Sequence, residues 1–486
     1  MVSRRAVLMG LGAAALVTGF DPVTRSWISA AHAATIDHVP DLDGELWTDP
    51  SSLAPYADDV GKIIHQTPVA VLRPGSARDI QKMVRFCRKR RIKIAARGQG
   101  HSTFGQSQVA GGLVIDMASL NKIHSIGPCT AEVDGGATWK QLVNASVPLG
   151  YTPPALTGYI NLSIGGTLSM GGVSSTNAQG AQVDNVRELE VVTGEGELVR
   201  CSSSCNTQLF EAVLAGVGQC GIITRATVEV VPAKPQSRVF LLNYTDNATF
   251  FNDFRTLLNR GEFDGLYNIW VPGDSGGLVY QLNAIKHFDP AHPPDDASLL
   301  RGLHYDRATS TSSDSSYLDQ VQSVDVIIDF LRSIGLFDAV IHPWFDVFLP
   351  DAKVEQYVAD VLPTLTPEDV GPTGFMLLFA LKRSKLKRPL LRVPERGDYV
   401  YLFDILTSSS VPGDPDPAFV SRMLARNRRL FEKARDLGGT RYPIGSLEFS
   451  RSDWERQYGN QWDDFKRAKR RFDPDALLAP NLGIFT

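Results

Sequence analysis

ARGQGHSTFGQSQ, residues 96–108, sets a single histidine, His101, among three glycines. Glycine is required where the backbone takes a left-handed conformation or approaches a bulky group closely. Gly98, Gly100 and Gly105 therefore predict a tight turn that brings the main chain against a ligand. In such a turn the imidazole is either a hydrogen-bonded loop residue or a reacting group, and the rest of the sequence has to decide between the two.

The composition is that of a globular protein long enough for two domains. The chain has 486 residues, of which 43% are apolar and 21% charged. Its net charge of -4 gives no electrostatic reason to expect nucleic acid as a partner. The five cysteines are too few and too irregular for a disulfide scaffold, although Cys201 and Cys205 are close enough in sequence to pair. No metal site is expected.

The first 34 residues have the pattern of an export signal. Paired arginines, Arg4 and Arg5, precede an apolar run over residues 8–17, and the segment ends in Ala31-His32-Ala33. This order is typical of a twin-arginine signal peptide, and the apolar run is too short to span a bilayer. We expect residues 1–34 to be removed, no membrane span in the mature chain, and a secreted or periplasmic location. An ordinary Sec signal or an uncleaved anchor is the alternative.

Strands and glycine-rich turns alternate between residues 60 and 233. We predict strands over 69–74, 92–96 and 111–117, and a helix over 77–90. Two later stretches resemble the first turn in their glycine content, IGGTLSMGGVSS and GVGQCGIITRATVEVV, residues 164–175 and 216–231.

The pattern changes after residue 234. Residues 234–440 mix longer strands with helices, one of them over 418–437. Proline-rich and serine-rich runs predict a polar loop between about 289 and 316. A tail over 441–486 carries a charged helix and ends the chain.

Three glycine turns in one domain indicate backbone N–H groups that line an extended anion, most readily a pyrophosphate. The dinucleotide fingerprint of a Rossmann fold does not fit, because its third glycine would fall on Thr103 and the segment leads to a strand. Among dinucleotides, FAD is the one that has a group with which the His101 imidazole can react. Its 8-methyl group becomes electrophilic after tautomerisation, and a neutral imidazole can attack it. A covalent link would retain the flavin outside the cell and raise its reduction potential.

The order of several long motifs resembles that of the covalent flavoprotein oxidases of the vanillyl-alcohol oxidase type, and within them the cytokinin dehydrogenases. The similarity covers nearly all of the mature chain. The motifs that carry it are RGQGHSTFGQ (97–106), LSIGGTLSMGGVSS (162–175), LFEAVLAGVGQCGIITRATV (209–228), HPWFDVFLP (342–350) and RFDPDALLAP (471–480).

The resemblance implies an α+β fold with a PCMH-type two-part FAD-binding domain and a separate α/β substrate (cap) domain. The FAD-binding domain would span 60–233, the substrate domain 234–440, and residues 441–486 would return to the flavin. FAD would be attached once, through His101, because the second turn carries no cysteine. The resemblance assigns the remaining cofactor contacts to Ala96, Gly98, Gly100, Ser102, Gln106, Ser163, Ser169, Val173, Ile222 and Tyr442.

Departures from the family pattern fall on the groups that handle the substrate. Cytokinin dehydrogenases carry a proton-accepting aspartate in a T-D-Y-x-x-L block, where this chain has Gly158. A glutamate of the substrate domain corresponds to Asn283, and a glutamine near the tail corresponds to Leu482. Losing a general base costs about 10²- to 10⁴-fold in rate. Either another residue takes the proton or the substrate differs.

Asp346, Tyr159 and Tyr442 are the candidate catalytic residues, and for Asp346 a purely structural role is the alternative. We expect hydride transfer from a small-molecule amine to the flavin, followed by reoxidation by dioxygen or an organic acceptor. The alternatives are oxidation of an alcohol, sugar or secondary metabolite, and a flavin-containing binding protein without turnover.

Overall fold

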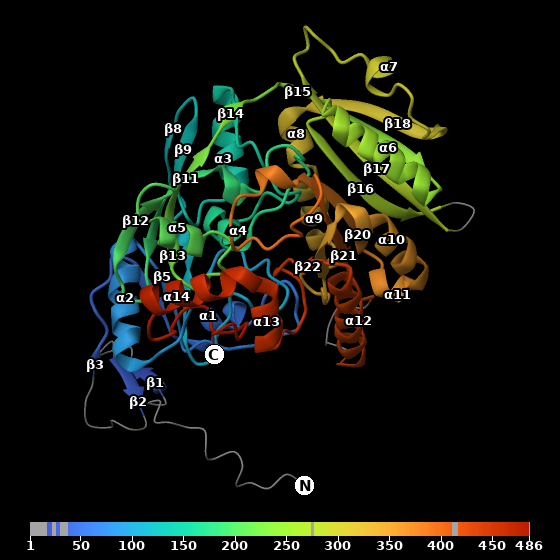
Figure 1. Ribbon diagram of the computed structural model, residues 1–486. Helices are drawn as coiled ribbons and strands as arrows, with labels where there is room; N and C mark the ends of the chain where they lie inside the picture. The colour runs from blue at the N-terminus through green and yellow to red at the C-terminus, as the bar shows by residue number, and fades with distance from the viewer. Residues whose placement is uncertain (1–16, 22–25, 30–36, 274–276, 411–416, 486) are drawn as a thin grey trace.

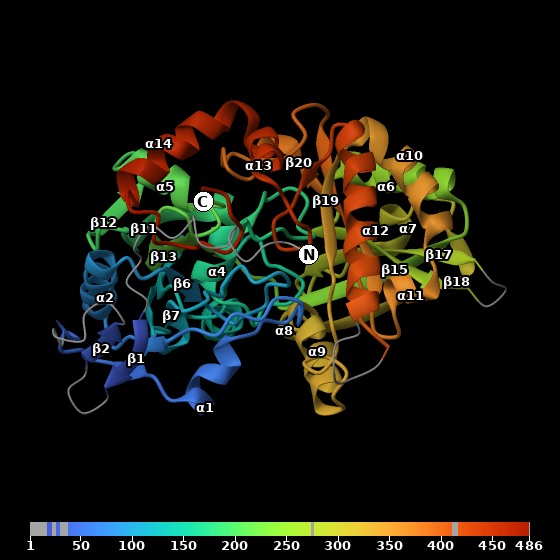
Figure 2. The same cartoon turned by 90° about the horizontal axis from the view of Figure 1, so that it is seen from below.

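The computed structural model describes residues 17–21, 26–29, 37–273, 277–410 and 417–485. These residues form five sheets, which lie in two halves side by side (Figures 1 and 2). One half is built from strands that precede residue 233, and the other from an eight-stranded sheet that follows it. Both halves mix helices and strands, as the α+β prediction requires.

A four-stranded sheet carries the first glycine turn. Its order is β4 (Glu45–Trp47), β5 (Ala70–Arg73), β7 (Leu113–Asp116) and β6 (Ile94–Arg97), with the last three strands parallel. Helix α2 (Ala77–Arg90) connects β5 to β6 over the predicted residues and packs its apolar stripe on the sheet. Strands covered on both faces need continuous apolar residues, which β5 and β7 supply. The turn begins where β6 ends.

A five-stranded antiparallel sheet carries the other two turns. Its order is β12 (Leu198–Ser202), β11 (Val186–Val192), β13 (Ile222–Glu229), β9 (Thr130–Asp134) and β8 (Ile123–Ile126). Buried and outward residues alternate along β9 and β13, so that one face can pack on helices. Those helices are α3 (Trp139–Ser146), α4 (Ile164–Met170) and α5 (Thr207–Val213). The second glycine turn contains α4, and the third leads into β13.

The second half is one antiparallel sheet. In spatial order its strands are β18 (Asp306–Ser316), β15 (Gln236–Tyr244), β17 (Leu278–Phe288), β16 (Gly265–Pro272), β20 (Phe375–Lys382), β21 (Tyr399–Leu406), β19 (Phe345–Pro350) and β22 (Thr440–Arg441). Helices α6 (Asn247–Arg260), α10 (Asp351–Val361) and α12 (Pro417–Asp436) lie along its outer side (Figure 1).

The two faces of this sheet serve different cores. Val347 of β19 and Phe403 of β21 pack in the cluster with α6 and α10. Phe348 and Leu402, one residue along, pack in the cluster of the first half. Because side chains alternate across a strand, even-numbered positions of β19 and β21 face the glycine turns. This inner face is one wall of the region between the halves.

The predicted polar loop over about 289–316 is wrong in its second part. Residues 306–316 form β18, which pairs with β15 along most of its length. Most of its side chains are exposed and none is buried, so no apolar alternation marks the strand in the sequence. Backbone pairing at a sheet edge, and not burial of side chains, holds this segment.

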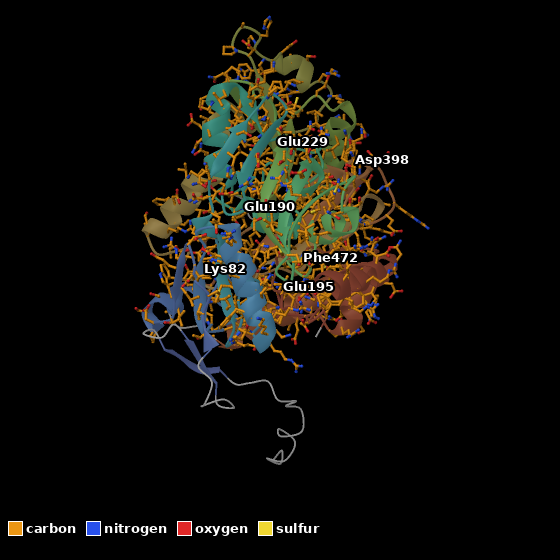
Figure 3. All side chains as sticks on the ribbon, turned by 90° about the vertical axis from the view of Figure 1, so that its left-hand side faces the viewer. Lys82, Glu190, Glu195, Glu229, Asp398 and Phe472 are labelled. Atoms are coloured by element: carbon orange, nitrogen blue, oxygen red, sulfur yellow. The ribbon has the colours of Figure 1, made fainter. Side chains whose placement is uncertain are left out.

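The tail crosses from the second half back to the first. After β22, helices α13 (Arg451–Tyr458) and α14 (Trp462–Phe472) pack on the first half, and Leu478 forms a parallel bridge with Ile94 of β6. Figure 3 shows Phe472 beside Glu195. The N–H of the preceding residue, Gly194, donates to the Phe472 carbonyl at 2.8 Å. The domain limits at 60, 233 and 440 stay predictions.

The predicted signal peptide is largely outside the described residues, including both arginines and the alanine site. Within it, β1 (Val17–Asp21) and β2 (Ser26–Ser29) form a hairpin that pairs with β3 (Asp37–His38). In the described part of the chain, no helix is both long and apolar enough to cross a membrane. All five cysteines are unpaired.

The other helices and strands are short connectors around these sheets: α1 (Pro50–Leu53), β10 (Tyr151–Thr152), β14 (Val231–Pro232), α7 (Asp296–Leu299), α8 (Tyr317–Val321), α9 (Ser323–Ser333) and α11 (Pro367–Val370).

Candidate functional site

The first glycine turn leaves three consecutive N–H groups unused. Gly100 has a φ of 63°, a left-handed conformation that favours glycine. The carbonyls of Gly100 and Ser102 accept hydrogen bonds from the N–H groups of Val60 and Gly61, at 3.0 and 3.3 Å. Among the described residues, the N–H groups of Gly100, His101 and Ser102 donate to no protein acceptor. Neighbouring N–H groups of this kind form an anion-binding nest.

The second and third turns lie against the first. A β-carbon at Gly98 would fall 1.8 Å from Oγ of Ser163, so only glycine lets the two turns approach this closely. Within α4, Gly166 is exposed and Ser169 is half-buried, although most of its neighbours are buried. The carbonyl of Ser169 accepts the N–H of Val217 in the third turn, at 2.8 Å. The three turns therefore form one connected surface.

The His101 imidazole sits in an aromatic cage. Its ring centroid lies 4.9 Å from Tyr159, 5.3 Å from Trp344 and 6.0 Å from Phe337. Burial, together with the positive charge of Arg332, lowers the pKa of His101 to about 3. The imidazole is therefore neutral at physiological pH. Its Nδ1 is enclosed without a hydrogen-bond partner, which leaves a ring nitrogen for another group.

The tail supplies contacts to the same surface. The hydroxyl of Tyr442 accepts the N–H of Gly172 at 3.1 Å, and burial raises the pKa of this tyrosine, which keeps it protonated. Nε2 of Gln106 donates to the carbonyls of Pro443 and Ile444, each at 3.1 Å. Tyr442 and Gln106 thus fasten the tail to the first and second turns.

Asp59 is a buried residue beside the first turn that sequence reasoning missed. Its carboxylate accepts the Ser102 hydroxyl at 3.1 Å and the Gly105 N–H at 2.7 Å. Burial raises the pKa of Asp59 to about 6, even though these hydrogen bonds lower it. The only sequence signal was a carboxylate shortly before a lone glycine, Gly61, which is too common a pattern to be informative. The hydroxyl of Ser102 donates to Asp59, and its predicted contact with the cofactor stays a prediction.

Three predicted cofactor residues occupy other parts of the first half. Ala96 is exposed near the end of β6. Val173 lies in the apolar cluster that contains Tyr442, whereas Ile222 lies in the cluster of the four-stranded sheet with Leu478. Val173 and Ile222 therefore pack in different clusters of the first half.

Tyr159 is held by a charged helix over the site. Nη1 of Arg332 in α9 donates to the Tyr159 hydroxyl at 2.9 Å. The preceding residue, Gly158, is exposed, and a β-carbon there would meet only Cγ2 of Val324, at 3.8 Å. The position next to the cage therefore has room for a side chain but carries no carboxylate.

The two other positions that depart from the family pattern, Asn283 and Leu482, lie in different parts of the molecule. Asn283 is 5% exposed on β17, and its Nδ2 donates to the carbonyl of Gln281 at 3.1 Å. Leu482 is half-buried in the tail, where its carbonyl accepts Nε1 of Trp454 at 3.1 Å. Neither residue can accept a proton, so the loss of ionisable groups predicted from the sequence holds at both positions.

Asp346 lies on the inner face of β19, directly opposite Asp404 of β21. The two residues are 3% and 4% exposed. Burial raises the pKa of Asp346 to about 7 against the opposing effects of Asp404 and Arg441, and burial with repulsion from Asp346 raises the pKa of Asp404 well above its usual value. Sequence reasoning missed Asp404. The signal was present, because a lone carboxylate interrupts the apolar strand YVYLFDIL (399–406).

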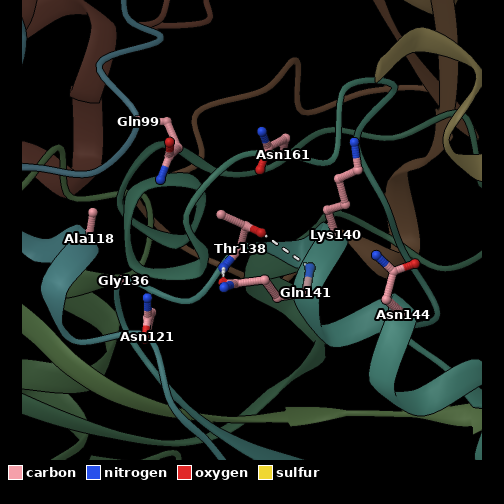
Figure 4. A pocket seen from close by; sticks show the side chains of 9 residues that line it. All are labelled: Gln99, Ala118, Asn121, Gly136, Thr138, Lys140, Gln141, Asn144 and Asn161. Carbon is pink, nitrogen blue, oxygen red and sulfur yellow. Dashed lines mark hydrogen bonds between the residues drawn. The ribbon is translucent and has the colours of Figure 1, made fainter. Parts of the chain in front are cut away.

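A polar cavity of about 330 Å³ opens at the outer edge of the turns (Figure 4). Gln99 of the first turn and Asn161, two residues before Ser163, both contribute to its wall. On its other side, Thr138 caps α3: its Oγ1 accepts the N–H of Gln141, and Oε1 of Gln141 accepts the N–H of Thr138. The lining is rich in amides and has no carboxylate, so the cavity offers hydrogen bonds but no general base.

The residues present fit FAD. A pyrophosphate needs unused N–H groups beside glycine backbone, and the first turn supplies both. A flavin ring bonded to His101 needs a neutral, unpartnered nitrogen, and Nδ1 is enclosed without a partner. The described residues include no group of three His, Cys, Asp or Glu side chains placed to hold a metal ion.

Comparison with known proteins identifies the family. The model of the FAD binding domain matches residues 68–202, and the model described as cytokinin dehydrogenase 1, FAD and cytokinin binding, matches residues 243–485. An uncharacterized oxidoreductase of the fasciation locus of Rhodococcoides fascians is 36% identical over 90% of this chain and 98% of its own length. Cytokinin dehydrogenase 1 of Oryza sativa subsp. japonica is 32% identical, over 94% and 95%, and cytokinin dehydrogenase 2 of Arabidopsis thaliana is 30% identical, over 94% and 96%.

These relatives match over nearly their full length, and both halves of the chain are covered. The resemblance predicted from the motifs is thereby confirmed at the level of family and cofactor class. The protein belongs to the cytokinin dehydrogenase family of FAD-dependent oxidoreductases.

Proposed function

We propose that this protein is an exported oxidoreductase that transfers hydride from a carbon next to an amine to FAD bound covalently through His101. The observation that carries the covalent link is the neutral imidazole whose Nδ1 is buried without a partner inside an aromatic cage. An unsatisfied buried nitrogen is costly, so a residue of this kind is expected to be completed by a bound group.

Each part of the site has a separate task in this proposal. The N–H groups at 100–102 bind the pyrophosphate, and Gly98 lets the first and second turns close on it. Tyr442 and Gln106 hold the tail over the turns, and the cage around His101 excludes water. Bound FAD supplies a two-electron acceptor for the substrate hydride. The PCMH-type arrangement of the flavin domain is part of this proposal.

His101 would hold FAD through a bond between an imidazole nitrogen and the 8-methyl carbon. Forming this bond would release two protons and pass two electrons to dioxygen. A neutral imidazole is required, because a protonated ring has no free lone pair for attack. The low pKa of His101 meets this requirement at any physiological pH.

The substrate proposed first is an amine of the cytokinin class, because the relatives named cytokinin dehydrogenase match both halves of the chain. Gly158 and Asn283 favour a second candidate, an alcohol, sugar or secondary metabolite, since the family's acidic groups are missing there. A binding protein without turnover is the third candidate. After substrate oxidation, dioxygen or an organic acceptor takes the electrons.

Export is proposed from the twin-arginine pattern, because that route moves proteins that are already folded and loaded with cofactor. The test fuses residues 1–34 to a reporter and compares this fusion with one in which both arginines are replaced by lysine (Arg4→Lys, Arg5→Lys). Loss of secretion in the substituted fusion supports the proposal, and equal secretion contradicts it.

The covalent link is tested by denaturing the purified flavoprotein in acid. In the wild type the yellow colour and the mass of the flavin should stay with the peptide that contains His101. In His101→Ala all flavin should pass into the supernatant. His124→Ala is the matched control and should keep the flavin bound, because this imidazole lies on β8 and is paired with Asp134 of β9. Free flavin released from the wild type, made with ample riboflavin, would contradict the covalent link.

The substrate is tested by anaerobic bleaching of the flavin. An isoprenoid-substituted adenine should bleach it faster than simple alcohols do if the amine proposal is correct. Faster bleaching by alcohols or sugars would favour the second candidate. Tight binding of the adenine with no bleaching by any compound would favour the binding protein.

A further inference from the structure

The inner face of β19 carries a carboxylate near the proposed flavin surface. Trp344, just before the strand, lies 5.3 Å from the His101 ring, and Phe348 lies 5.4 Å from the Tyr442 ring. Asp346 stands midway between these two residues and on the same side of the chain, since side chains alternate along a strand. Its side chain is therefore placed between the imidazole and the tail tyrosine.

Asp404 of β21 places a second carboxylate beside that of Asp346. Directly opposed residues of an antiparallel pair point to the same face of the sheet, so both acids share the inner face. Three of their four oxygens, both of Asp346 and Oδ1 of Asp404, are enclosed without a hydrogen-bond partner. Only Oδ2 of Asp404 is not enclosed in this way. A buried pair with so few partners is unfavourable for packing alone.

The groups around the pair leave it able to take up a proton. Arg441 of β22 is 1% exposed, and its Nε and Nη1 also lack partners, while Nη2 donates to the Gly445 carbonyl at 3.1 Å. A β-carbon at Gly445 would lie 2.4 Å from Oδ2 of Asp346, so glycine lets the tail close over that residue. Tyr442 is the remaining titratable group beside the pair, and it stays protonated.

Two adjacent carboxylates in a buried site cannot both be ionised without a large electrostatic cost, and the usual solution is a shared proton. We propose that Asp346 and Asp404 share one proton, and that Asp404 is the base that accepts the proton of the substrate amine or hydroxyl as hydride leaves the neighbouring carbon. This inference rests on the proposed function and adds the proton acceptor that Gly158 does not supply.

The step balances. The substrate loses a hydride from carbon to FAD and a proton from nitrogen or oxygen to Asp404, and a C=N or C=O bond forms. The pair passes from one proton to two, and returns the extra proton to solvent after the product leaves. Asp404 is the catalytic residue in this proposal, because its Oδ2 is the only one of the four oxygens that is not both enclosed and without a partner. Asp346 is a positioning residue that shares the resident proton with Asp404.

The test compares three isosteric variants of the flavin-loaded enzyme. Asp404→Asn should slow anaerobic bleaching by about 10²- to 10⁴-fold and remove its pH dependence. Asp346→Asn should slow it less and shift the acidic limb of the profile to lower pH, since the repulsion that raises the pKa of Asp404 is gone. Asp253→Asn, a buried acid of α6 on the outer side of the sheet, is the control and should keep the wild-type rate. Flavin content confirms folding in each variant.

A second readout needs no turnover. Infrared or carbon-13 aspartate spectra of the wild type should show a carboxyl group that titrates near pH 7, and either Asn variant should lose that transition. In the wild type, bleaching should slow below about pH 7, because the second proton then fills the acceptor.

The outcomes separate the two proposals. Wild-type bleaching with unchanged rates and profiles in both Asn variants overturns the shared-proton pair and leaves the proposed function intact. Absence of a titrating carboxyl near neutral pH also overturns the pair. If neither amines nor alcohols bleach the wild type, turnover fails as a proposal, while the spectroscopic titration still decides whether the pair shares a proton.

Discussion

At position 158 the backbone has room for a side chain that the sequence does not supply. The nearest atom to an added β-carbon is Cγ2 of Val324, at 3.8 Å, an ordinary van der Waals distance. The next residue, Tyr159, contacts the His101 ring. A short acid at this position would therefore stand beside the imidazole without displacing the turn.

Gly158→Asp is predicted to speed flavin reduction by amine substrates, by up to about 10²-fold if proton transfer limits the wild type. Gly158→Asn has the same shape and no base, so it is the control and should stay at the wild-type rate. Stopped-flow bleaching under anaerobic conditions measures both. An equal effect of Asp and Asn would show that shape, and not proton acceptance, is responsible.

At the scale of single residues, the sequence predicted His101 as a functional residue but not Asp404. His101 stood out because a histidine among glycines is rare, and its cage and unused Nδ1 are consistent with a reacting role. Asp404 did not stand out, because its meaning depends on Asp346, a residue 58 positions earlier in the chain that only strand pairing brings opposite it. A pair created by register cannot be read from either residue alone.

Among elements, α13 depends on its first turn. Ser450 and Asp453 form a capping box, and Asp453 also accepts Nη1 of Arg428 at 2.9 Å. Burial alone would raise the pKa of Asp453, but the hydrogen bonds from Arg428 and Ser450 outweigh it and lower the pKa to about 2. The ionised carboxylate is therefore the form that stabilises the helix.

Asp453→Ala is predicted to lower the free energy of unfolding by about 1 kcal/mol at neutral pH. The unfolded pKa is about 3.9, so the contribution of Asp453 is complete above pH 4 and is lost as the pH falls toward 2. Urea unfolding at pH 7 and at low pH measures the difference. Asp463→Ala, in the first turn of α14 but exposed, is the control and should change little at either pH.

Elements were predicted well where burial is periodic. Helix α2 begins and ends at the predicted residues, because apolar positions recur on one face and a basic run occupies its last turn. The sequence predicts a loop where β18 forms, because the serines and threonines of this segment are exposed and bury no face. Its position is decided by the free edge of β15, which is a property of the sheet and not of the segment.

At the scale of the whole molecule, the tail joins the two halves. It leaves the eight-stranded sheet at β22, places Tyr442 against the second turn, and ends beside β6. The family motifs predicted this return, but its fastening could not be predicted from sequence. Nζ of Lys469 donates to Asp473 at 2.7 Å, and Asp473 accepts the N–H groups of Leu477 and Leu478 at 2.9 and 2.8 Å.

Lys469→Met is predicted to cost about 3 to 5 kcal/mol of unfolding free energy, because it leaves the buried Asp473 carboxylate without its cation. Adding Asp473→Asn removes that uncompensated charge and should recover part of the loss, which distinguishes an ionic clasp from simple packing. The exposed Arg470→Met is the control. Because the clasp holds the segment that bridges to Ile94, proteolysis of the tail should accelerate together with the loss of stability in Lys469→Met. Loss of stability with unchanged tail cleavage would mean that the two halves are joined mainly elsewhere, through the contacts of Gln106 and Tyr442 around the glycine turns.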